Sequence, residues 1–439
     1  RYSARQAGRY TLDVRCAGER VSGSPFTVQF APSAAVASSS VVSGHGLVKA
    51  VAGNDASVMV ALHDAFGNPV RSSSGAVVQA ALTGPSGAGE CRVADAGNGT
   101  FKVTYKASLA GRYRLHIDLN KTPLLGAPFD VTVAPAAVDA DKCTLFGEGL
   151  VRAVAGKQSS FIVHGFDKYG NSCRIGDARV TCELRGPAPV SLSLSDCGDG
   201  SFEVLYTPTI AGRYAIDLAV GGRAVPAAAT AVVDVVAGEA AASQCALLSR
   251  EPSSVVAGTT NSFTIYAADA LGNRRTVGGA VFCATVSCGD SVVEGSVTDE
   301  GDGVYTVRFR SVMAGVAQVS VTLNDAHIKA SPFTVSVTPA ATAGVCSLVS
   351  GVPSVIVAGS ATTCTVTAHD AYGNARGRGG DRFGAVLRAG SDCSEASVTD
   401  NEDGTYTVHM RPTKTGVYGM SVSLDNMPVC APLPVLVQA

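Results

Sequence analysis

Apolar and polar residues alternate in short runs along the chain, and Gly, Pro, Asn and Asp separate the runs. The last unit shows this clearly, because Cys364, Val366 and Ala368 alternate with polar residues before the run ends in a turn. Alternation with a period of two is typical of strands that bury one face. Residues 342–439 contain about seven such segments, with turn residues every ~8–12 positions, which predicts an immunoglobulin-like sandwich of two antiparallel sheets.

One six-residue phrase recurs through the chain. Its four copies are HDAFGN at 63–68, FDKYGN at 166–171, ADALGN at 268–273 and HDAYGN at 369–374. The aspartates are 103, 102 and 101 residues apart. An acid/base pair such as His63–Asp64 is one interpretation, but the two middle copies lack histidine. Asp and Asn bond to nearby backbone, and Gly and Asn tolerate positive φ, so we predict a repeated structural turn.

A second repeated motif is Asp-x-x-(Asp/Asn)-Gly-x-(Phe/Tyr), and its final aromatics are Phe101, Phe202, Tyr305 and Tyr406. Asn-Gly or Asp-Gly between alternating segments predicts a tight β-hairpin. The aromatic residue is then expected to point into the sandwich. Calcium binding is the alternative, but the ligand spacing, flanking helices and late Glu of an EF-hand are missing, so we predict no metal.

Two further landmarks, Ala-Gly-x-Tyr and Ser/Ala-Pro-Phe, divide the chain into units. Residues 1–33 match the C-terminal part of a unit, so we expect the chain to be a fragment. Four full units follow at 34–135, 136–237, 238–340 and 341–439. The joins between them are only a few residues long, which predicts tandem sandwiches arranged as an elongated rod.

Composition supports an all-β protein, since Val, Thr, Ala and Gly are abundant and Trp is absent. The net charge of −2 and the lack of a basic stripe argue against a nucleic-acid partner. No apolar run is long enough to span a bilayer. The 13 cysteines are unequal between units, which favours free thiols in a reducing compartment over disulfides. Two sequons, at Asn98 and Asn120, point the other way.

Enzyme motifs are missing from the sequence. There is no Gly-x-Ser-x-Gly or His-Glu-x-x-His, and AVAGKQS at 153–159 lacks the residues of a phosphate loop. Cys283 and Cys288 have no second pair at zinc spacing. We therefore predict no catalytic residue, no cofactor, no metal and no small-molecule substrate.

The order Gly-x-Gly-Leu, Asp-Gly-x-Tyr, Ala-Gly-x-Tyr and Ser-Pro-Phe within about 100 residues resembles the filamin repeat (filamin/ABP280 repeat family). The first element is GHGL at 44–47 and GEGL at 147–150. The resemblance covers essentially the whole chain, with 1–33 as the end of one repeat. Bacterial immunoglobulin-like adhesin repeats also use the Asp-x-x-Gly-Asn turn and stay a competitor. The resemblance to the filamin repeat implies a cytoskeletal rod, whose repeats bind extended peptides beside strands C and D.

This resemblance, with the free edges of an open sandwich, predicts where a peptide would bind. The expected C and D strands are Val77–Leu82 with Glu90–Val93, Val180–Leu184 with Val190–Leu194, Val281–Val286 with Val292–Val297, and Phe383–Leu387 with Glu395–Thr399. The alternative is that loops or the next repeat cover these edges. The unit at 136–237 alternates most cleanly, and its candidate partner-binding residues are Val180, Cys182, Leu184, Leu192 and Leu194.

Two function classes follow. The first is a non-enzymatic scaffold that spaces and docks other proteins, either extended peptide segments or cytoskeletal components, in a cytoplasmic, cytoskeletal or ciliary assembly. The second is an extracellular or cell-surface adhesion array. Oxidation of the cysteines and glycosylation of Asn98 and Asn120 distinguish them, and the unequal cysteines favour the first.

Overall fold

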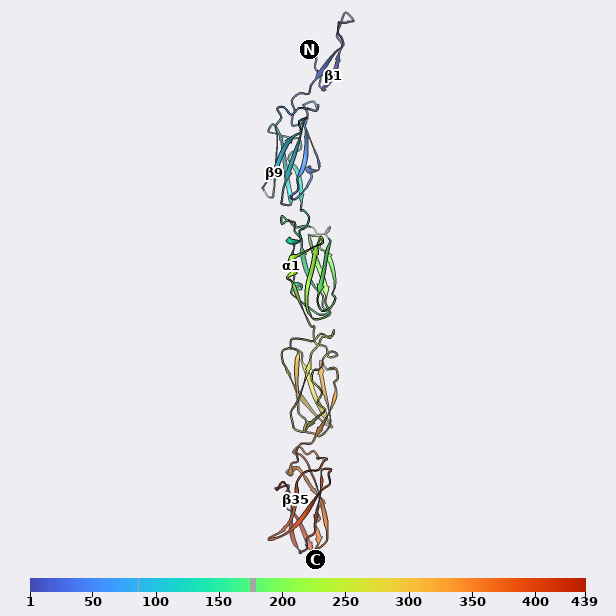
Figure 1. The fold of residues 1–439 in the computed structure, drawn as a ribbon, viewed down its shortest axis with the longest axis vertical. Helices are drawn as coiled ribbons and strands as arrows, with labels where there is room; N and C mark the ends of the chain where they lie inside the picture. The colour runs from blue at the N-terminus through green and yellow to red at the C-terminus, as the bar shows by residue number, and fades with distance from the viewer. Residues whose placement is uncertain (86, 174–178) are drawn as a thin grey trace. The chain divides into compact units, whose positions relative to one another are not determined.

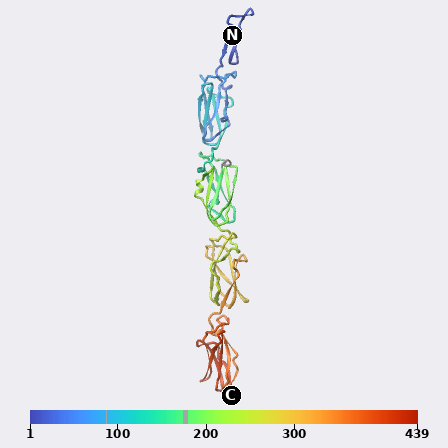
Figure 2. The same ribbon diagram turned by 45° about the vertical axis from the view of Figure 1, so that its right-hand side comes forward.

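The computed structural model describes residues 1–85, 87–173 and 179–439. These residues fold almost entirely into β-strands, which Figures 1 and 2 show gathered into separate sandwiches. Two compact units are formed. The first comprises Arg1–Ala153, Lys157–Pro208 and Gly212–Asp234, and the second comprises Val154–Gly156, Thr209–Ala211 and Val235–Ala439. The tandem all-β fold expected from the sequence is confirmed. We number the predicted full units repeats 1 to 4, and their boundaries stay a prediction.

The strands before and within repeat 1 follow the expected order. Residues 1–33 form β1 (Gly8–Leu12), β2 (Arg15–Cys16), β3 (Glu19–Arg20) and β4 (Phe26–Phe30). Repeat 1 contains β5 (Val41–Ser43), the 3-10 turn η1 (His45–Leu47), β6 (Lys49–Val51), β7 (Ala56–Ala61), β8 (Val78–Gly84), β9 (Gly87–Asp95), β10 (Thr100–Lys106), β11 (Gly111–Leu119), β12 (Thr122–Pro123) and β13 (Phe129–Ala134).

Repeat 2 departs from this order by a short helix, α1, before its last strand. Its elements are η2 (Ala140–Lys142), β14 (Thr144–Phe146), η3 (Glu148–Leu150), β15 (Arg152–Val154), β16 (Ser159–His164), β17 (Val180–Arg185), β18 (Ser191–Asp196), β19 (Ser201–Thr207), β20 (Gly212–Val220), β21 (Arg223–Ala224), α1 (Pro226–Ala229) and β22 (Val232–Val236). The helix stands where repeats 1 and 3 carry Ala/Ser-Pro-Phe and repeat 4 carries Ala-Pro-Leu, and Figure 1 labels it.

Repeats 3 and 4 return to the pattern of repeat 1. Repeat 3 contains β23 (Ala246–Leu247), β24 (Ser254–Val256), β25 (Asn261–Tyr266), β26 (Phe282–Cys288), β27 (Ser291–Asp299), β28 (Val304–Phe309), β29 (Gly315–Leu323), β30 (Ala326–His327) and β31 (Phe333–Thr338). Repeat 4 contains η5 (Gly344–Cys346), β32 (Leu348–Ser350), β33 (Val355–Val357), β34 (Thr362–Thr367), β35 (Phe383–Ala389), β36 (Asp392–Asp400), β37 (Thr405–Met410), β38 (Gly416–Leu424), β39 (Met427–Pro428) and β40 (Leu433–Gln438).

Strand pairing within a repeat is illustrated by repeat 3, where the order is β23-β25-β28-β27-β26-β29-β31-β24. In sandwich nomenclature β26 is strand C and β27 is strand D. The expectation of purely antiparallel sheets is wrong at one place in each of repeats 1, 3 and 4, because a short strand runs parallel to the final strand: β6 to β13, β24 to β31 and β33 to β40. The first strand region thus divides into two short strands, β23 and β24, which pair with different strands of the repeat.

Each sandwich is filled by the apolar members of the alternating pattern. In repeat 3 the core includes Ile265, Val307, Val319 and Val335, all completely buried. Burying a side chain of this size stabilises a fold by about 1.5–3 kcal/mol relative to leaving it exposed. The predicted hairpin aromatics Phe101, Tyr305 and Tyr406 are buried in their cores. Phe202 is only half-buried, so the expectation of full burial is wrong for repeat 2.

Candidate functional site

The edge between strands C and D of repeat 2 is the place where the predicted partner-binding residues meet. Among the described residues, β17 is the last strand of a sheet ordered β15-β22-β20-β17, and β18 is the last strand of a sheet ordered β14-β16-β19-β18. The two strands therefore face each other without forming a ladder. Each leaves one row of backbone groups for another partner.

Hydrogen bonds just outside the strands show which groups lie on these free edges. Gly221 N donates to Arg179 O at 2.9 Å, so the bonded positions of β17 are the odd-numbered residues. On β18, Cys197 N donates to Ser201 O at 3.0 Å, so the odd-numbered residues of β18 are the ones that bond to β19. The free N–H and C=O groups consequently belong to the even-numbered residues. Those in the predicted set are Val180, Cys182, Leu184, Leu192 and Leu194.

The side chains of these same five residues line the inner face of the gap. Leu184 is buried, whereas Val180, Cys182, Leu192 and Leu194 are half-buried and the residues between them are exposed. In repeat 3 the corresponding side of strand C, from Phe282 to Cys288, is buried throughout. The gap in repeat 2 therefore combines partly exposed apolar side chains with unpaired backbone groups. An extended peptide has the geometry to satisfy both.

The connection beside this open edge is rich in proline. The connection from β17 to β18 reads Gly-Pro-Ala-Pro-Val at 186–190, and two prolines cannot donate to a ladder. In repeats 3 and 4 the connections are the two-residue turns Gly289-Asp290 and Gly390-Ser391, which are hairpin turns. This difference was visible in the sequence and our sequence reasoning did not use it.

The other three repeats therefore differ from what the sequence analysis assumed. Strand C pairs with strand D through Leu82–Gly84 in repeat 1, Ala284–Cys288 in repeat 3 and Ala385–Ala389 in repeat 4. Their C edges are occupied over those residues by the chain's own strand D. The expected strands were otherwise placed within a few residues of the observed ones.

Charges around the open edge lie on the opposite face of β17. Arg185 forms ion pairs with Glu183 and Asp217, and all three side chains are about half exposed or more. Exposed pairs of this kind contribute little to stability. Burial, followed by the nearby Asp217 and Glu183 charges, raises the pKa of the Cys182 thiol to about 11. Cys182 is thus protonated at neutral pH and is a poor nucleophile.

The repeated Asp-x-x-Gly-Asn turn is the second candidate site, because it lies where neighbouring repeats meet. In repeat 2 the buried Asp167 carboxylate accepts hydrogen bonds from Tyr169 N, Asn171 N and the Asn171 side chain. It also accepts one from Ala136 N, at the start of the repeat, at 2.8 Å. The prediction of a structural turn rather than a catalytic pair agrees with this bonding, because every carboxylate contact is to the turn or to the join.

The asparagine of the same turn reaches the preceding repeat. Asn171 Nδ2 donates to Ser108 O at 2.8 Å, and Ala110 N donates to Asn171 Oδ1 at 2.8 Å. Asn68, Asn273 and Asn374 make the same two contacts with the turns at residues 5–7, 209–211 and 312–314. Each turn ends at the alanine that opens the Ala-Gly-x-Tyr landmark or its variant, so two repeated motifs form one junction.

An apolar contact completes the junction. Tyr169 lies over Gly53 of repeat 1, where an added Cβ would be 1.9 Å from the Tyr169 hydroxyl oxygen. Tyr372 covers Gly258 in the same way, at 2.1 Å. Side chains larger than glycine would displace these rings. The Val-Ala-Gly turns at 51–53 and 256–258 are therefore the receiving surfaces for the next repeat's aromatic residue.

Comparison with known families decides the identity of these units. The family model described as Filamin/ABP280 repeat matches residues 34–130, 137–228, 237–334 and 342–431. The chain belongs to the filamin repeat family.

Two filamins are among the proteins to which this chain is similar. Filamin-C of Rattus norvegicus is 25% identical over 454 residues, which cover 97% of this chain and 16% of that protein. Filamin-A of Drosophila melanogaster is 25% identical over 362 residues, covering 80% of this chain and 16% of that protein. The chain thus spans about a sixth of these filamins. A solved structure of the Escherichia coli adhesin FdeC is 21% identical, with a TM-score of 0.45, and covers 70% of this chain and all of that one.

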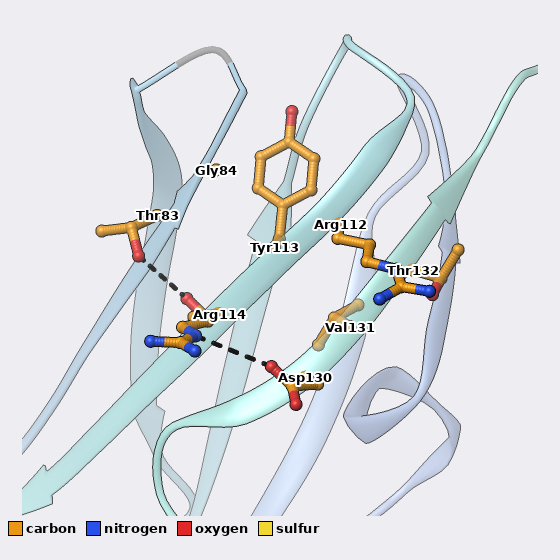
Figure 3. Close-up of a pocket in the computed structure, with 8 residues that line it drawn as sticks. All are labelled: Thr83, Gly84, Arg112, Tyr113, Arg114, Asp130, Val131 and Thr132. Atoms are coloured by element: carbon orange, nitrogen blue, oxygen red, sulfur yellow. Dashed lines mark hydrogen bonds and ion pairs between the residues drawn. The ribbon is translucent and has the colours of Figure 1, made fainter.

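Among the described residues, the surface of repeat 1 carries a hollow away from the edge between β17 and β18 (Figure 3). Its volume is about 560 Å³, and it is lined by Thr83, Gly84, Arg112, Tyr113, Arg114, Asp130, Val131 and Thr132. Arg114 Nε lies 3.7 Å from Asp130, and both side chains are largely exposed. Arg112 and Arg114 at this hollow are exposed to water, and Arg114 is already paired with Asp130. The hollow therefore presents no charged group that is held in place to bind a ligand.

Three further properties of the described filamin repeats bear on function. No group of three or more His, Cys, Asp and Glu side chains in this part of the chain is placed to hold a metal ion. No helix in the described ranges has the length and apolar character needed to cross a membrane. The 13 cysteines are free thiols, and Cys143, Cys173, Cys245, Cys288 and Cys364 are buried.

Proposed function

We propose that this chain is a non-enzymatic scaffold whose repeat 2 docks a partner protein by β-strand addition to β17. The observation that carries the proposal is the missing ladder between β17 and β18. An extended segment of the partner pairs with the free groups of Val180, Cys182 and Leu184. Its alternate side chains enter the apolar gap against Leu192 and Leu194.

The energetics favour a short, reversible docking segment. Each new backbone hydrogen bond contributes about 0.5–1.5 kcal/mol net, and the apolar gap adds burial of four half-exposed side chains. Ordering the partner segment offsets part of this gain. The family supports the scaffold assignment, since filamin repeats are non-enzymatic modules that mediate protein–protein contacts. The free, unequal cysteines support a cytoplasmic, cytoskeletal or ciliary location.

The decisive experiment uses proline at Cys182. Because the N–H of Cys182 lies on the free edge, Cys182→Pro removes one donor to the partner without removing a ladder bond to β20. Thr181→Pro, by contrast, removes a bond to Ala219 and tests the fold instead. Cys182→Ala is the matched control, because it shortens the side chain and keeps the N–H.

Partner proteins captured by the 439-residue chain from an extract are identified by mass spectrometry, and the three variants are compared. We expect wild type and Cys182→Ala to retain the same partner, and Cys182→Pro to lose it while keeping its β-sheet circular dichroism spectrum. Retention of the partner by folded Cys182→Pro contradicts docking at this edge.

A further inference from the structure

The hairpin between β9 and β10 in repeat 1 contains the one Asn-Gly pair of the sequence, Asn98-Gly99. The equivalent hairpins of repeats 2, 3 and 4 carry an acid before their glycine, as Asp199, Asp302 and Asp403. Repeat 1 therefore holds the amide of a residue that is a carboxylic acid in the other three repeats.

Two hydrogen-bond donors converge on the side-chain carbonyl of Asn98. Thr100 N donates to Asn98 Oδ1 at 3.2 Å, and Thr100 Oγ1 donates to the same oxygen at 2.6 Å. Donors placed on a carbonyl oxygen stabilise the oxyanion that develops when a nucleophile attacks the carbonyl carbon. The hairpin thereby activates Asn98 Cγ toward attack.

The nucleophile that lies next to this carbon along the chain is the backbone nitrogen of Gly99. Among the described contacts, no hydrogen bond engages the Gly99 N–H. Gly99 has a φ of +76°, and an added Cβ would lie 1.6 Å from Val70 O, so the turn requires glycine here. The absence of a side chain leaves the Gly99 nitrogen unhindered. Asn98 itself is exposed, so ammonia can leave and water can enter.

We propose that Asn98 is a site of spontaneous deamidation, which the folded hairpin promotes. Gly99 N attacks Asn98 Cγ and a new C–N bond forms. The Asn98 amide group leaves as ammonia and takes the proton of the Gly99 nitrogen. Water then opens the five-membered imide. Cleavage at the side-chain carbon gives aspartate, and cleavage at the backbone carbon gives isoaspartate. The net reaction consumes one water and releases one ammonia.

The fold of the other repeats shows that the aspartate product fits. In repeat 4, Asp403 Oδ1 accepts hydrogen bonds from Thr405 N at 2.9 Å and from Thr405 Oγ1 at 2.6 Å, which are the bonds that Asn98 accepts in repeat 1. The bond from the Thr405 side chain, followed by that from its N–H, lowers the pKa of Asp403. Isoaspartate routes the backbone through the side-chain carbon and deprives Thr100 of this acceptor. The two products therefore differ in whether the start of β10 stays fixed.

Asn120 provides an internal comparison, because it is also exposed and also lies in a hairpin of repeat 1. Its Oδ1 accepts a hydrogen bond from Val77 N at 2.8 Å. The next residue is Lys121, whose side chain hinders attack by its own nitrogen. Deamidation at Asn98 does not depend on peptide docking at repeat 2.

The test incubates the 439-residue chain at neutral pH and follows both asparagines by peptide mapping with mass spectrometry. Fragment ions separate aspartate from isoaspartate. We expect conversion at Asn98 to be at least about tenfold faster than at Asn120. Thr100→Val removes the hydroxyl donor and keeps the branched shape, so it should slow conversion at least about fivefold. Thr100→Ser keeps the hydroxyl, which Ser201 supplies in repeat 2, and should retain most of the wild-type rate.

The same chains in denaturant separate promotion by the fold from the chemistry of any Asn-Gly pair. We expect wild type to convert faster when folded than when unfolded, and the Thr100→Val effect to disappear in denaturant. Hydrogen exchange of β10 shows whether Thr100→Val is folded. Equal conversion of folded Thr100→Val and wild type overturns the proposal. Slower conversion of wild type in the folded chain than in the unfolded chain also overturns it, whatever the variant does.

Discussion

The hydroxyl of Tyr105 donates a 2.5 Å hydrogen bond to the carbonyl of Gly46, and both residues are buried. Tyr206 makes the same bond to Gly149. These glycines are the second in each Gly-x-Gly-Leu motif, where a Cβ would lie 2.8 Å or less from the carbonyl oxygen of strand β7 or β16. In repeats 3 and 4 the tyrosine position holds Phe309 and Met410, and the motif is absent. The glycine motif and the tyrosine hydroxyl therefore form one structural device.

Tyr105→Phe is expected to destabilise repeat 1 by about 1–3 kcal/mol, because it leaves the buried Gly46 carbonyl without its donor. Burial raises the pKa of Tyr105 to about 12, so the hydroxyl stays protonated and able to donate at neutral pH. Hydrogen exchange of β10 amides measures the loss. Phe309→Tyr in repeat 3 is the control. It should give no stabilisation, because repeat 3 lacks the Gly-x-Gly-Leu motif whose carbonyl accepts the hydroxyl's hydrogen bond in repeat 1. An unchanged exchange rate in Tyr105→Phe would show that water replaces the donor.

Asn171→Ala should uncouple repeat 2 from repeat 1. The substitution removes the bonds to Ser108 O and Ala110 N, together with a bond to Asp167. We expect the Ala110 amide to exchange at least about tenfold faster, while amides in the centre of β11 keep their protection. Tyr169→Ser removes the ring over Gly53 and leaves the Asp167 turn intact, so it is the matched comparison. Equal exchange at Ala110 in all three proteins would mean that the asparagine contacts do not couple the repeats.

The same turns make the junctions sensitive to acid. Burial raises the pKa of Asp167, but hydrogen bonds from the Asn171 side chain and from the N–H groups of Ala136, Asn171 and Tyr169 lower it more, so the net pKa is below its ordinary value. Asp269 and Asp370 are lowered by equivalent bonds against the same burial. Because the folded-state pKa lies below the unfolded one, this stabilisation is fully present above about pH 4. It is lost progressively as the pH falls through the folded-state pKa.

Thermal unfolding between pH 2 and pH 7 checks this expectation. The melting temperature should be nearly constant from pH 5 to 7 and fall steeply below about pH 4. Asp167→Asn should be less stable at pH 7 and show a smaller loss on acidification for its own repeat. A wild-type melting curve that is equally stable at pH 2 and pH 6 would argue that these carboxylates do not support the native state.

The stability cost of replacing a hairpin aromatic should depend on how deeply its side chain is buried. Phe101→Ala should cost on the order of 3–5 kcal/mol in repeat 1, because Phe101 is only 6% exposed and fills its core. Phe202→Ala should cost less, because Phe202 is half-buried. Repeat-resolved hydrogen exchange compares the two. Equal costs would indicate that exposure does not control the effect at this position.

Local sequence was sufficient for features that depend on nearby residues. The period of two placed the inward-facing residues, such as Val366 and Ala368, because one face of each strand must be buried. The Asn-Gly and Asp-Gly pairs placed the hairpins before Phe101 and Tyr406, because such turns depend only on adjacent residues. Non-local pairing was harder to predict. The two halves of the junction, Asn171 and Ser108, are 63 residues apart, and neither motif alone indicates that it binds the other. The half-buried state of Phe202 likewise depends on how the sandwich around it closes.

The opening between β17 and β18 is itself testable, without knowing any partner. If Pro187 and Pro189 keep the strands apart, then replacing residues 187–189 by Gly-Asp should join Gly186 to Val190 through a two-residue turn like that of repeat 3, which Cys288 and Ser291 flank. The new register would place Leu184 opposite Leu192, with both side chains inward, and would keep Gly186 beside Tyr214. The free N–H groups of Cys182 and Leu192 would then gain partners, and their exchange should slow by at least about tenfold. Pro187→Ser/Pro189→Ser keeps the loop length and isolates the effect of proline, with a smaller slowing expected. Rapid exchange of both amides in the folded Gly-Asp variant would show that the proline connection is not what holds this edge open.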